Sequence, residues 1–227
     1  MNRALSPEWL DELPANAREA LDSRRDLRRL NAFLRHPSFV AEALLCCFPR
    51  GAPRSVVELG AGDGSFLLKT ASRLAPRWPS VHAILVDRSE AAGNGLRREF
   101  ARIGWTLEIV AADVFDWLEQ NEVDAAVANL FLHHFDQPAL QRLLRLLSVK
   151  STAIVACEPR RALAPLCLSY LLGLAGANAV TRHDAPISVR AGFRKGELTS
   201  LWPSPVWRLR ERGAGLCSHL FVASCSQ

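Results

Sequence analysis

The chain of 227 residues contains little cysteine, and none of its six cysteines lies in a C-x-x-C pair. Cys46 and Cys47 are adjacent, a spacing that suits neither a zinc knuckle nor a redox pair. Six cysteines are also too few for a disulfide scaffold in a chain of this size. The first residues, MNRALSPEWLDEL, lack the continuous apolar run of a secretory signal. We therefore expect a protein of the reducing cytoplasm.

Excess charge is also small, because 28 basic and 23 acidic residues leave a formal net charge of +5. A solvated helix face is therefore a better explanation of the basic clusters than nucleic-acid binding. These clusters are Arg24, Arg25, Arg28 and Arg29, then Arg160 and Arg161. Hydrophobic residues make up 49% and charged residues 22%, which is ordinary globular composition and excludes disorder, collagen and coiled coil. The length favours one large domain with a cap.

The first fifty residues have the pattern of helices and form the expected N-terminal cap, residues 1–50. Ser6 and Pro7 are an N-cap and first-turn pair, which predicts a short helix through about residue 13. A second helix is expected over about 15–35, ended by His36-Pro37, and a third over 40–47. In the second helix a leucine stripe lies nearly opposite the four arginines: Leu27, Leu30 and Leu34.

From residue 54 onward, short apolar runs alternate with amphipathic segments. The runs are SVVELG, VHAILVD, TLEIVAAD, VDAAVANL and STAIVACE, and the helices between them are expected at 65–75, 89–103, 114–120 and 138–148. Apolar runs of about six residues, each followed by a helix, predict βαβ units and a parallel sheet buried on both faces. VWRLRER and CSHLFVAS, separated by Gly213 and Gly215, predict an antiparallel hairpin over 205–224 that completes this α/β sheet.

The segment 162–180 contains no charged residue over nineteen positions. That length raises the question of a transmembrane helix. Pro165, Gly173 and Gly176 interrupt the segment, and it lies between two strands of one sheet, which a single crossing would separate. We expect no stable membrane span but a buried or lid helix that forms an apolar wall, and contact with a membrane surface stays open.

A glycine-rich loop follows the first expected strand and opens a helix: Glu58-Leu-Gly60-Ala61-Gly62-Asp63-Gly64. Glycines are needed where the chain turns tightly and its backbone approaches a ligand. A dinucleotide fingerprint would require glycine at position 65, which is serine. Glu58 and Asp63 would also oppose a pyrophosphate, so the loop favours a ligand that carries a positive amine and no phosphate.

Polar side chains also end the next three strands: Asp87, Asp113 and Asn129. The carboxyl ends of parallel strands share the edge at which open α/β sheets bind ligands. An acid in the position of Asp87 accepts hydrogen bonds from both hydroxyls of a ribose, and one at Asp113 lies within reach of an adenine amino group. Asp113 fits a helix N-cap equally well.

These motifs resemble those of the class I S-adenosylmethionine-dependent methyltransferases. The resemblance rests on E-L-G-A-G-D-G, the acid at Asp87, A-A-D at 111–113 and N-L-F-L-H-H-F at 129–135. It covers residues 54–158 by motif and reaches the C-terminus by element order. It implies a Rossmann-like, mostly parallel sheet of seven strands with the last pair antiparallel and helices on both faces. The small-molecule branch, including quinone-biosynthesis enzymes, is most similar, through L-H-H-F and I-S-V-R-A-G-F-R-K-G-E-L at 187–198.

The resemblance implies S-adenosyl-L-methionine as cofactor and S-adenosyl-L-homocysteine as product. By position, Gly60, Gly62 and Gly64 would pass under the methionine part. Asp87 would hold the ribose, and Asp113 with Val114 would flank the adenine. The remaining residues implied for the cofactor site are Asn129 and Leu130 near the sulfonium, and Glu58, Ala61, Asp63 and Arg88.

The acceptor side is less specified. His133 and His134 follow the fourth strand and are candidate catalytic bases, although in this family the paired histidines often pack structurally. His183 and Arg190 lie in the expected lid and substrate region, 159–204, and are candidate substrate contacts. His36, His82 and His219 have no partner pattern and are expected to be structural. We expect no metal, because no second aspartate at a strand end joins Asn129 and Asp136.

Three functions stay open. The first is methyl transfer to oxygen or carbon of a small, apolar or aromatic acceptor. The second is RNA methylation with the arginine helix at 24–29 binding phosphates, which steep salt dependence would reveal. The third is an inactive cofactor-binding protein. Nucleic acid is disfavoured because no Pro-Cys, Asn-Pro-Pro or Asp-Pro-Pro occurs and the six tryptophans are scattered. The acceptor and the oligomeric state are not determined by the sequence.

Overall fold

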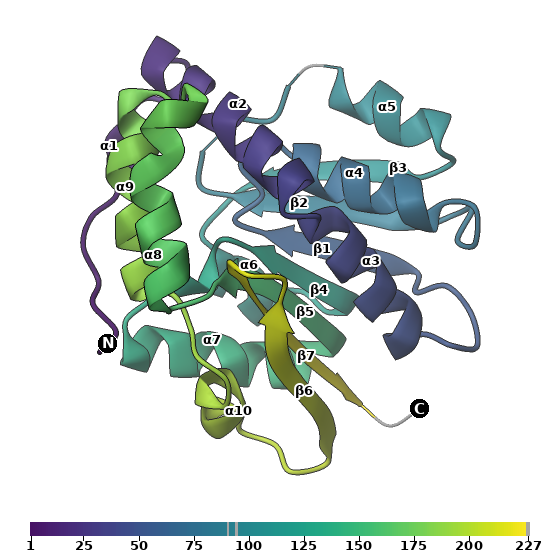
Figure 1. Ribbon diagram of the computed structural model, residues 1–227. Helices are drawn as coiled ribbons and strands as arrows, with labels where there is room; N and C mark the ends of the chain where they lie inside the picture. Colours follow the sequence, from purple (N-terminus) through teal and green to yellow (C-terminus); the bar gives the residue numbers. More distant parts are fainter. Residues whose placement is uncertain (90, 94, 226–227) are drawn as a thin grey trace.

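The computed structural model describes residues 1–89, 91–93 and 95–225. Its centre is a seven-stranded sheet in the order β3-β2-β1-β4-β5-β7-β6 (Figure 1). The strands are β1 Ser55–Leu59, β2 His82–Asp87, β3 Thr106–Ala111, β4 Val123–Asn129, β5 Ser151–Pro159, β6 Trp207–Ala214 and β7 Ser218–Cys225. Strands β1 to β5 pair in parallel, and β7 pairs antiparallel with both β5 and β6. The predicted mostly parallel α/β sheet and its C-terminal hairpin are confirmed.

The register places the ligand-binding edge at one end of the central strands. Leu59 of β1 lies beside Val86 of β2 on one side and beside Ala128 of β4 on the other. The residues that follow these strands therefore meet at the carboxyl edge of the sheet. The glycine loop, Asp87 and Asn129 all lie there, as the sequence predicts.

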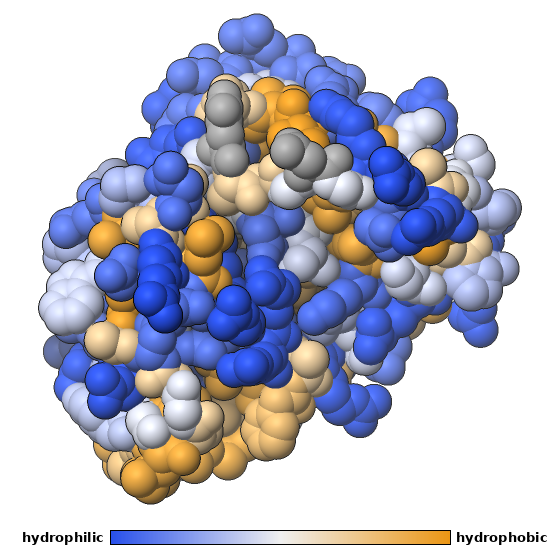
Figure 2. All heavy atoms as spheres, turned by 90° about the horizontal axis from the view of Figure 1, so that it is seen from above, coloured by the Kyte–Doolittle hydropathy of each residue, from blue (hydrophilic) through white to orange (hydrophobic). Residues whose placement is uncertain are grey.

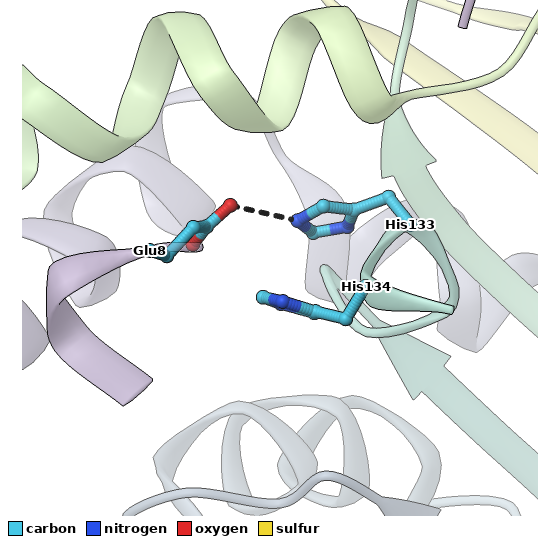
Figure 3. Close-up of side chains that lie close together, drawn as sticks. All are labelled: Glu8, His133 and His134. Carbon is cyan, nitrogen blue, oxygen red and sulfur yellow. Dashed lines mark ion pairs between the residues drawn. The ribbon is translucent and has the colours of Figure 1, made fainter. Parts of the chain in front are cut away.

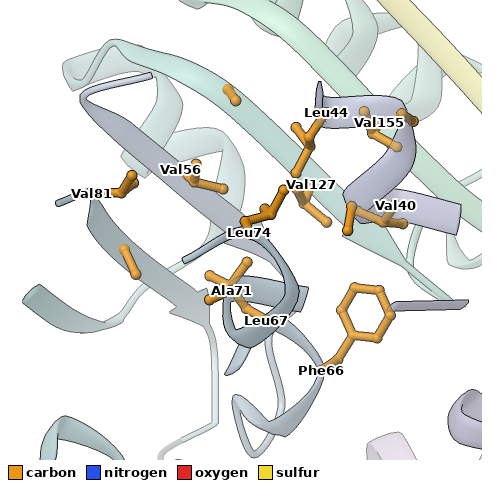
Figure 4. Packing of buried hydrophobic residues seen from close by; sticks show 14 of the residues in the cluster. Val40, Leu44, Val56, Phe66, Leu67, Ala71, Leu74, Val81, Val127 and Val155 are labelled. Carbon is orange, nitrogen blue, oxygen red and sulfur yellow. The ribbon is translucent and has the colours of Figure 1, made fainter. Parts of the chain in front are cut away.

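Helices cover both faces of the sheet because its strands are apolar on both sides. On one face α3 (His36–Cys47), α4 (Ser65–Leu74) and α5 (Leu96–Arg102) pack against alternate strand residues such as Val56 and Val127 (Figure 4). On the other face α6 (Val114–Gln120), α7 (Gln137–Lys150) and α10 (Glu197–Leu201) pack against the intervening residues, such as Val57 and Ala126. Burial of both faces fixes the register of the strands.

Several helix boundaries differ from the predicted ones. The helix expected over 89–103 begins only at Leu96, because glycines at 93 and 95 disfavour a helical backbone; residues 90 and 94 lie outside the described residues. The helix expected over 15–35 is α2, Arg18–Phe33, and Arg35 turns the chain with a φ of 60°. His36 and Pro37 open α3 rather than closing α2, since proline fits the first helical turn.

The first helix, α1, spans Trp9–Glu12 and is not capped by Ser6 as predicted. Its free amides instead donate to a residue of another helix, α9 (Ala179–Ala191). Asp184 accepts hydrogen bonds from the Trp9 N–H at 2.9 Å and the Leu10 N–H at 3.0 Å. A carboxylate at a helix N-terminus satisfies unpaired donors and the helix dipole. The start of α1 is therefore set by packing against α9.

The charge-free segment is broken into α8 (Leu163–Tyr170), a short 3-10 helix η2 (Leu171–Ala175) and the start of α9. In the described part of the chain, no helix is both long and apolar enough to span a membrane. Figure 2, seen from above, shows apolar side chains gathered on the side of α8 and η2. The exposed ones in these elements include Leu163, Leu168, Leu171 and Leu174.

A helical cap, formed by α1, α2, α8 and α9, lies over the carboxyl edge of the sheet (Figure 1). Polar contacts join α2 to the start of α9. Asp26 accepts a hydrogen bond from the Asn178 N–H at 2.8 Å, and the hydroxyls of Ser23 and Thr181 lie 3.1 Å apart. Elements from both ends of the chain therefore enclose the edge at which the site residues meet.

Candidate active site

A cavity of about 1020 Å³ lies between the carboxyl edge of the sheet and the helical cap. Protein cavities for small ligands measure roughly 300–1,000 Å³, so this one has room for a cofactor together with an acceptor. The glycine loop and the strand ends line one part. Leucines of the cap line another: Leu5, Leu10, Leu13, Leu27, Leu30 and Leu34. The predicted apolar wall is confirmed, because Pro165, Leu168, Leu171 and Leu172 of the charge-free segment also line the cavity.

The three loop glycines have positive φ angles for different reasons. A Cβ atom on Gly60 would lie 2.1 Å from the ring of Phe131, and one on Gly64 would lie 2.5 Å from Leu85 and Leu96. A Cβ on Gly62 would meet no atom within 4 Å. Gly60 and Gly62 line the cavity. Gly62 is thus the position at which the backbone is left open to a ligand, while Gly60 and Gly64 permit close packing.

Acidic side chains organise this loop. Asp87 Oδ2 accepts a hydrogen bond from the Gly62 N–H at 2.8 Å, and its Oδ1 accepts one from the Ser89 N–H at 2.7 Å. Asp63 accepts one from the Ser65 N–H at 3.0 Å and forms an ion pair with Arg28 of α2. Asp87 and Asp63 line the cavity, together with Ala61 and Arg88. The structure therefore brings the predicted acids of the loop and of β2 together.

Glu58 is the deepest of the predicted acids and is 2% exposed. Burial, with the nearby charges of Asp63 and Asp87, raises the pKa of Glu58 well above its usual value, although a hydrogen bond from the Leu67 N–H opposes this. The protonated form of Glu58 is therefore favoured by its surroundings. A positive amine would find acceptor oxygens here, as the sequence predicts.

Asp113 is the N-cap of α6, where its Oδ1 accepts a hydrogen bond from the Phe115 N–H at 2.8 Å. The capping interpretation is confirmed, and Asp113 with Val114 also lines the cavity. Leu130, which follows β4, has a φ of 53°. A leucine rarely adopts this backbone conformation, and such strain is typical of functional sites.

His36 is not the isolated histidine that the sequence suggests. Its Nδ1 lies 2.8 Å from Asn31 Oδ1 and 3.1 Å from Asn129 Oδ1, and its Nε2 lies 2.6 Å from Ser218 Oγ. Burial lowers the pKa of His36 to about 4, so the ring is neutral at physiological pH. The network fixes the side chain of Asn129, whose Nδ2 donates to Asn31 at 3.2 Å. Of the four, His36, Asn31 and Asn129 line the cavity.

His133 and His134 face Glu8 of the N-terminal segment (Figure 3). His133 is 2% exposed, with its Nδ1 2.8 Å from Glu158 Oε2 and its Nε2 3.4 Å from Glu8 Oε1. Burial opposes its protonation, but the hydrogen bond with Glu158 and the charges of Glu158 and Glu8 outweigh this and raise the pKa of His133 to about 9. His133 therefore holds its proton at neutral pH and is no ready base.

Glu158 and Asp11 support these two histidines. Glu158 ends β5, is fully buried, and accepts hydrogen bonds from the Leu132 N–H at 2.9 Å and the Phe131 N–H at 3.1 Å. Burial opposes ionisation of Glu158, but the contact with His133 and these amides hold its pKa below the usual value. Asp11 Oδ2 lies 3.2 Å from His134 Nδ1. Both histidines, together with Glu8 and Asp11, line the cavity.

His183 and Arg190 lie outside the lining of the cavity. The ring of His183 stacks on Trp9 at a centroid distance of 3.7 Å, and its Nδ1 lies 2.7 Å from Asp184. Arg190 is exposed at its guanidinium and bonds the Tyr170 hydroxyl. Both residues hold parts of the cap together.

The arginines of α2 do not all project away from the leucine stripe as predicted, because Arg24 and Arg28 line the cavity with it. Each of the four has a partner within the chain. Arg28 pairs with Asp63, and Arg24 donates to the Ala15 carbonyl. The remaining pairs are Arg25 with Asp22 and Arg29 with Asp26.

Sequence reasoning missed Glu8, Asn31 and Glu158. Glu158 has the same signal as Asp87, an acid at the carboxyl end of a parallel strand, and could have been found by extending that argument to β5. Glu8 and Asn31 belong to the cap, where no local pattern marks them. The predicted cofactor residues, in contrast, nearly all line one cavity: Glu58, Gly60, Ala61, Gly62, Asp63, Asp87, Arg88, Asp113, Val114, Asn129 and Leu130.

Residues 56–149 match the family model described as a methyltransferase domain. This segment runs from β1 into α7 and contains the glycine loop, Asp87, Asp113 and the two histidines. The match supports the resemblance of this segment to the S-adenosylmethionine-dependent methyltransferases, and the seven-stranded topology agrees with it. No curated protein sequence matches the chain.

Solved structures of methyltransferases share the fold. An O-methyltransferase family protein from Burkholderia thailandensis has 16% identity and a TM-score of 0.61, over 94% of this chain and 63% of that one. The chain thus spans less than two thirds of that protein. The plantazolicin methyltransferase BpumL, in complex with a desmethylPZN analog and SAH, has 14% identity and a TM-score of 0.66, over 96% and 93%. The N-methyltransferase NodS from Bradyrhizobium japonicum, in complex with SAH, has 14% identity and a TM-score of 0.52, over 84% and 87%.

Proposed function

We propose that this protein transfers a methyl group from S-adenosylmethionine to oxygen or carbon of a small apolar or aromatic acceptor. The observation that carries the proposal is a single cavity in which the acid-lined glycine loop faces a wall of leucines. The loop suits a cofactor with an amine and a ribose, and the leucines suit an apolar molecule beside it. Methylation of a quinone-type acceptor stays a prediction from sequence resemblance.

The residues of the loop fit the cofactor at two places. Gly62 leaves open space above the backbone, so the methionine part has room to pass. Asp87 ends β2 with its carboxylate at the cavity, where it would accept hydrogen bonds from the ribose hydroxyls. Asp113 and Val114 would flank the adenine, and Asn129 with Leu130 would lie near the sulfonium. When bound, the cofactor supplies an electrophilic methyl group.

The protein's own part in the transfer is to place the acceptor and exclude water. Methyl transfer is an in-line displacement, so its rate depends on how well the two reactants are aligned. The cap leucines would hold the apolar body of the acceptor, while His133 and His134 would contact its polar end. The Asn31–His36–Asn129 network would keep Asn129 in one rotamer beside the reacting centre. With cofactor and acceptor bound beneath α1, α2 and α8, little room would be left for water at the reacting centre.

The contacts of the arginine helix disfavour RNA as the acceptor. All four arginines have a partner within the chain, and the three ion pairs neutralise part of the charge that would attract phosphates. The solved relatives supply a parallel for a small acceptor, since BpumL has been solved with a desmethylPZN analog. NodS is an N-methyltransferase, so the shared fold does not decide which atom accepts the methyl group. An oxygen or carbon acceptor is therefore part of the proposal.

Calorimetric titration with S-adenosylmethionine and S-adenosylhomocysteine tests the cofactor assignment. We expect Asp87→Ala to weaken binding of either by at least about tenfold, the loss expected for hydrogen bonds to a charged group. Asp116→Ala is a matched control, because Asp116 is exposed on α6 and does not line the cavity. Unchanged affinity in Asp87→Ala, or equal loss in both variants, would contradict the assignment.

The acceptor class is tested by methyl uptake from labelled cofactor into phenols, quinone precursors and polyketides. We expect turnover with at least one of these and little dependence on salt. Turnover with RNA that falls steeply as salt is raised would overturn the small-molecule assignment. Tight cofactor binding without turnover on any acceptor would instead indicate an inactive cofactor-binding protein.

A further inference from the structure

Glu8, His133 and His134 form a cluster at the cavity that the transfer reaction alone does not explain (Figure 3). Each can offer one ligand atom, and these three atoms all lie within 4.8 Å of one another. Glu8 comes from the segment before α1, while the histidines come from the 3-10 helix η1, Leu132–His134. Two imidazoles and one carboxylate are the usual ligands of zinc and related first-row metal ions.

The Nε2 atom of His133 is the strongest sign of a missing ligand. It is fully buried, yet among the described residues it has no hydrogen-bond partner. Buried polar nitrogens are nearly always paired, so an unpaired one calls for an explanation. Glu8 Oε1 lies 3.4 Å away from Nε2, too far for a good hydrogen bond. Two ligands at about 2.1 Å from a tetrahedral ion lie about 3.4 Å apart, so the separation fits an ion between these atoms.

Each of the three side chains is also held by a neighbour. Glu158 Oε2 accepts a hydrogen bond from His133 Nδ1 at 2.8 Å, which directs Nε2 toward Glu8. Asp11 Oδ2 lies 3.2 Å from His134 Nδ1, and the Ser188 hydroxyl donates to Glu8 Oε1 at 2.5 Å. Carboxylates behind histidine ligands orient the rings and raise their affinity for metal.

We propose that Glu8, His133 and His134 bind a divalent first-row transition-metal ion of the zinc class at the acceptor side of the cavity. The ion would take the place of the proton on His133 Nε2, because an imidazole that binds a metal is neutral and its proton is released to water. Three protein ligands leave a coordination position open, as in catalytic rather than structural zinc sites. Because the three side chains line the cavity, the open position faces the acceptor. The ion would anchor an acceptor oxygen there, and this role rests on the proposed methyl transfer. Binding of the metal itself does not depend on that proposed function.

This proposal replaces the expectation of no metal, which considered only aspartates at the strand ends. Glu8 lies far from η1 in the sequence. The packing of α1 against α9 brings it to the histidines, together with Arg3, which donates a hydrogen bond to the His133 carbonyl at 3.0 Å. The set differs from a hard-cation site, which would use oxygen ligands throughout. Mg²⁺ and Ca²⁺ should therefore bind poorly at this position.

The test is titration of tag-free, chelator-treated full-length protein with Zn²⁺ and Co²⁺ by calorimetry, with no methyl donor present. We expect about one ion per chain and tetrahedral-type visible absorption for Co²⁺. Glu8→Gln and His134→Ala should each weaken metal binding by at least about tenfold. Loss of a residue that only hydrogen-bonds to a metal ligand already weakens binding about tenfold, so loss of a ligand should cost at least as much. Neither change cuts into the sheet core, and thermal unfolding verifies that each variant is folded.

His82→Ala is the matched control, because His82 is a partly exposed histidine beside a carboxylate, Glu108, at the opposite end of β2. Its binding should equal that of the parent protein. Failure to bind Zn²⁺ or Co²⁺ would overturn the proposal, as would equal affinity in Glu8→Gln, His134→Ala and His82→Ala. Because no cofactor is present, loss of metal binding is distinguishable from failure of the methyltransferase assignment, which the Asp87 titration measures.

Discussion

The close approach of Gly60 to Phe131 gives a quantitative prediction for the glycine loop. Gly60 and Gly62 have similar φ angles, 66° and 53°, but different surroundings. Alanine in this left-handed conformation costs roughly 1–2 kcal/mol, so both substitutions carry that term. Only at Gly60 would the new methyl also meet a ring atom, at 2.1 Å. Overpacking of this kind costs about 1–3 kcal/mol.

We therefore expect Gly62→Ala to lower the free energy of unfolding by about 1–2 kcal/mol and Gly60→Ala by about 1–3 kcal/mol more. Urea unfolding at constant temperature measures both values. In a domain of this size each kcal/mol corresponds to about 2–4 °C in the melting temperature. Cofactor binding should be weakened more by Gly62→Ala than its small loss of stability would suggest. The Gly62→Ala methyl enters the space proposed for the cofactor, while the fold stays largely intact.

A second substitution isolates the contact. Phe131→Ala removes the ring atoms that the Gly60→Ala methyl would meet, so the double variant should be more stable than the sum of the single effects predicts. We expect a coupling of at least about 0.5 kcal/mol, the lower end for residues in contact. Equal destabilisation by Gly60→Ala and Gly62→Ala, or strictly additive effects in the double variant, would refute this account of the loop.

Two further predictions concern the cap. The pKa of His36 is about 4 in the folded protein, against 6.5 for an ordinary histidine. Between pH 6.5 and pH 4 the unfolded chain therefore binds a proton at this residue that the folded chain does not bind. Because of this difference, the free energy of unfolding falls as the pH drops from 6.5 to 4. The free energy of unfolding of His36→Gln should fall less steeply over this range, and identical slopes would contradict the assignment. Asp184→Ala removes the cap of α1 and should cost about 0.5–2 kcal/mol. Hydrogen exchange should accelerate in residues 1–13 more than in β1 or β4, and uniform acceleration would indicate a global effect instead.

The sheet and the glycine-loop side of the cavity could be predicted because their signals are local. Apolar runs such as 82–87 identify buried strands wherever they lie, and glycines at 60, 62 and 64 mark a tight turn. The strand-end acids follow from a general rule, that parallel strands place their carboxyl ends at one edge. Asp87 and Gly62 accordingly lie within hydrogen-bond distance.

The cap side of the cavity was predicted less well because its residues come from segments that meet only in the folded chain. Ser6-Pro7 is a good local start for a helix, yet α1 begins at Trp9 because Asp184 of α9 satisfies its amides. His36 has no neighbour in sequence that explains it, and its partners, Asn31, Asn129 and Ser218, come from three different elements. Packing also turned His183 and Arg190 away from the cavity.

The sequence by itself thus determined the class of fold, the parallel strands with their C-terminal hairpin, and the edge of the sheet at which the predicted site residues meet, since each depends on short-range patterning. The tertiary structure alone decided the burial of the two histidines after β4 and the side chains that they contact. His133 is buried between two carboxylates, Glu158 of β5 and Glu8 of the N-terminal segment, which lie on either side of it in the sequence. Such an arrangement depends on a few ångströms of packing between remote helices, and no periodicity or motif in the sequence encodes that distance.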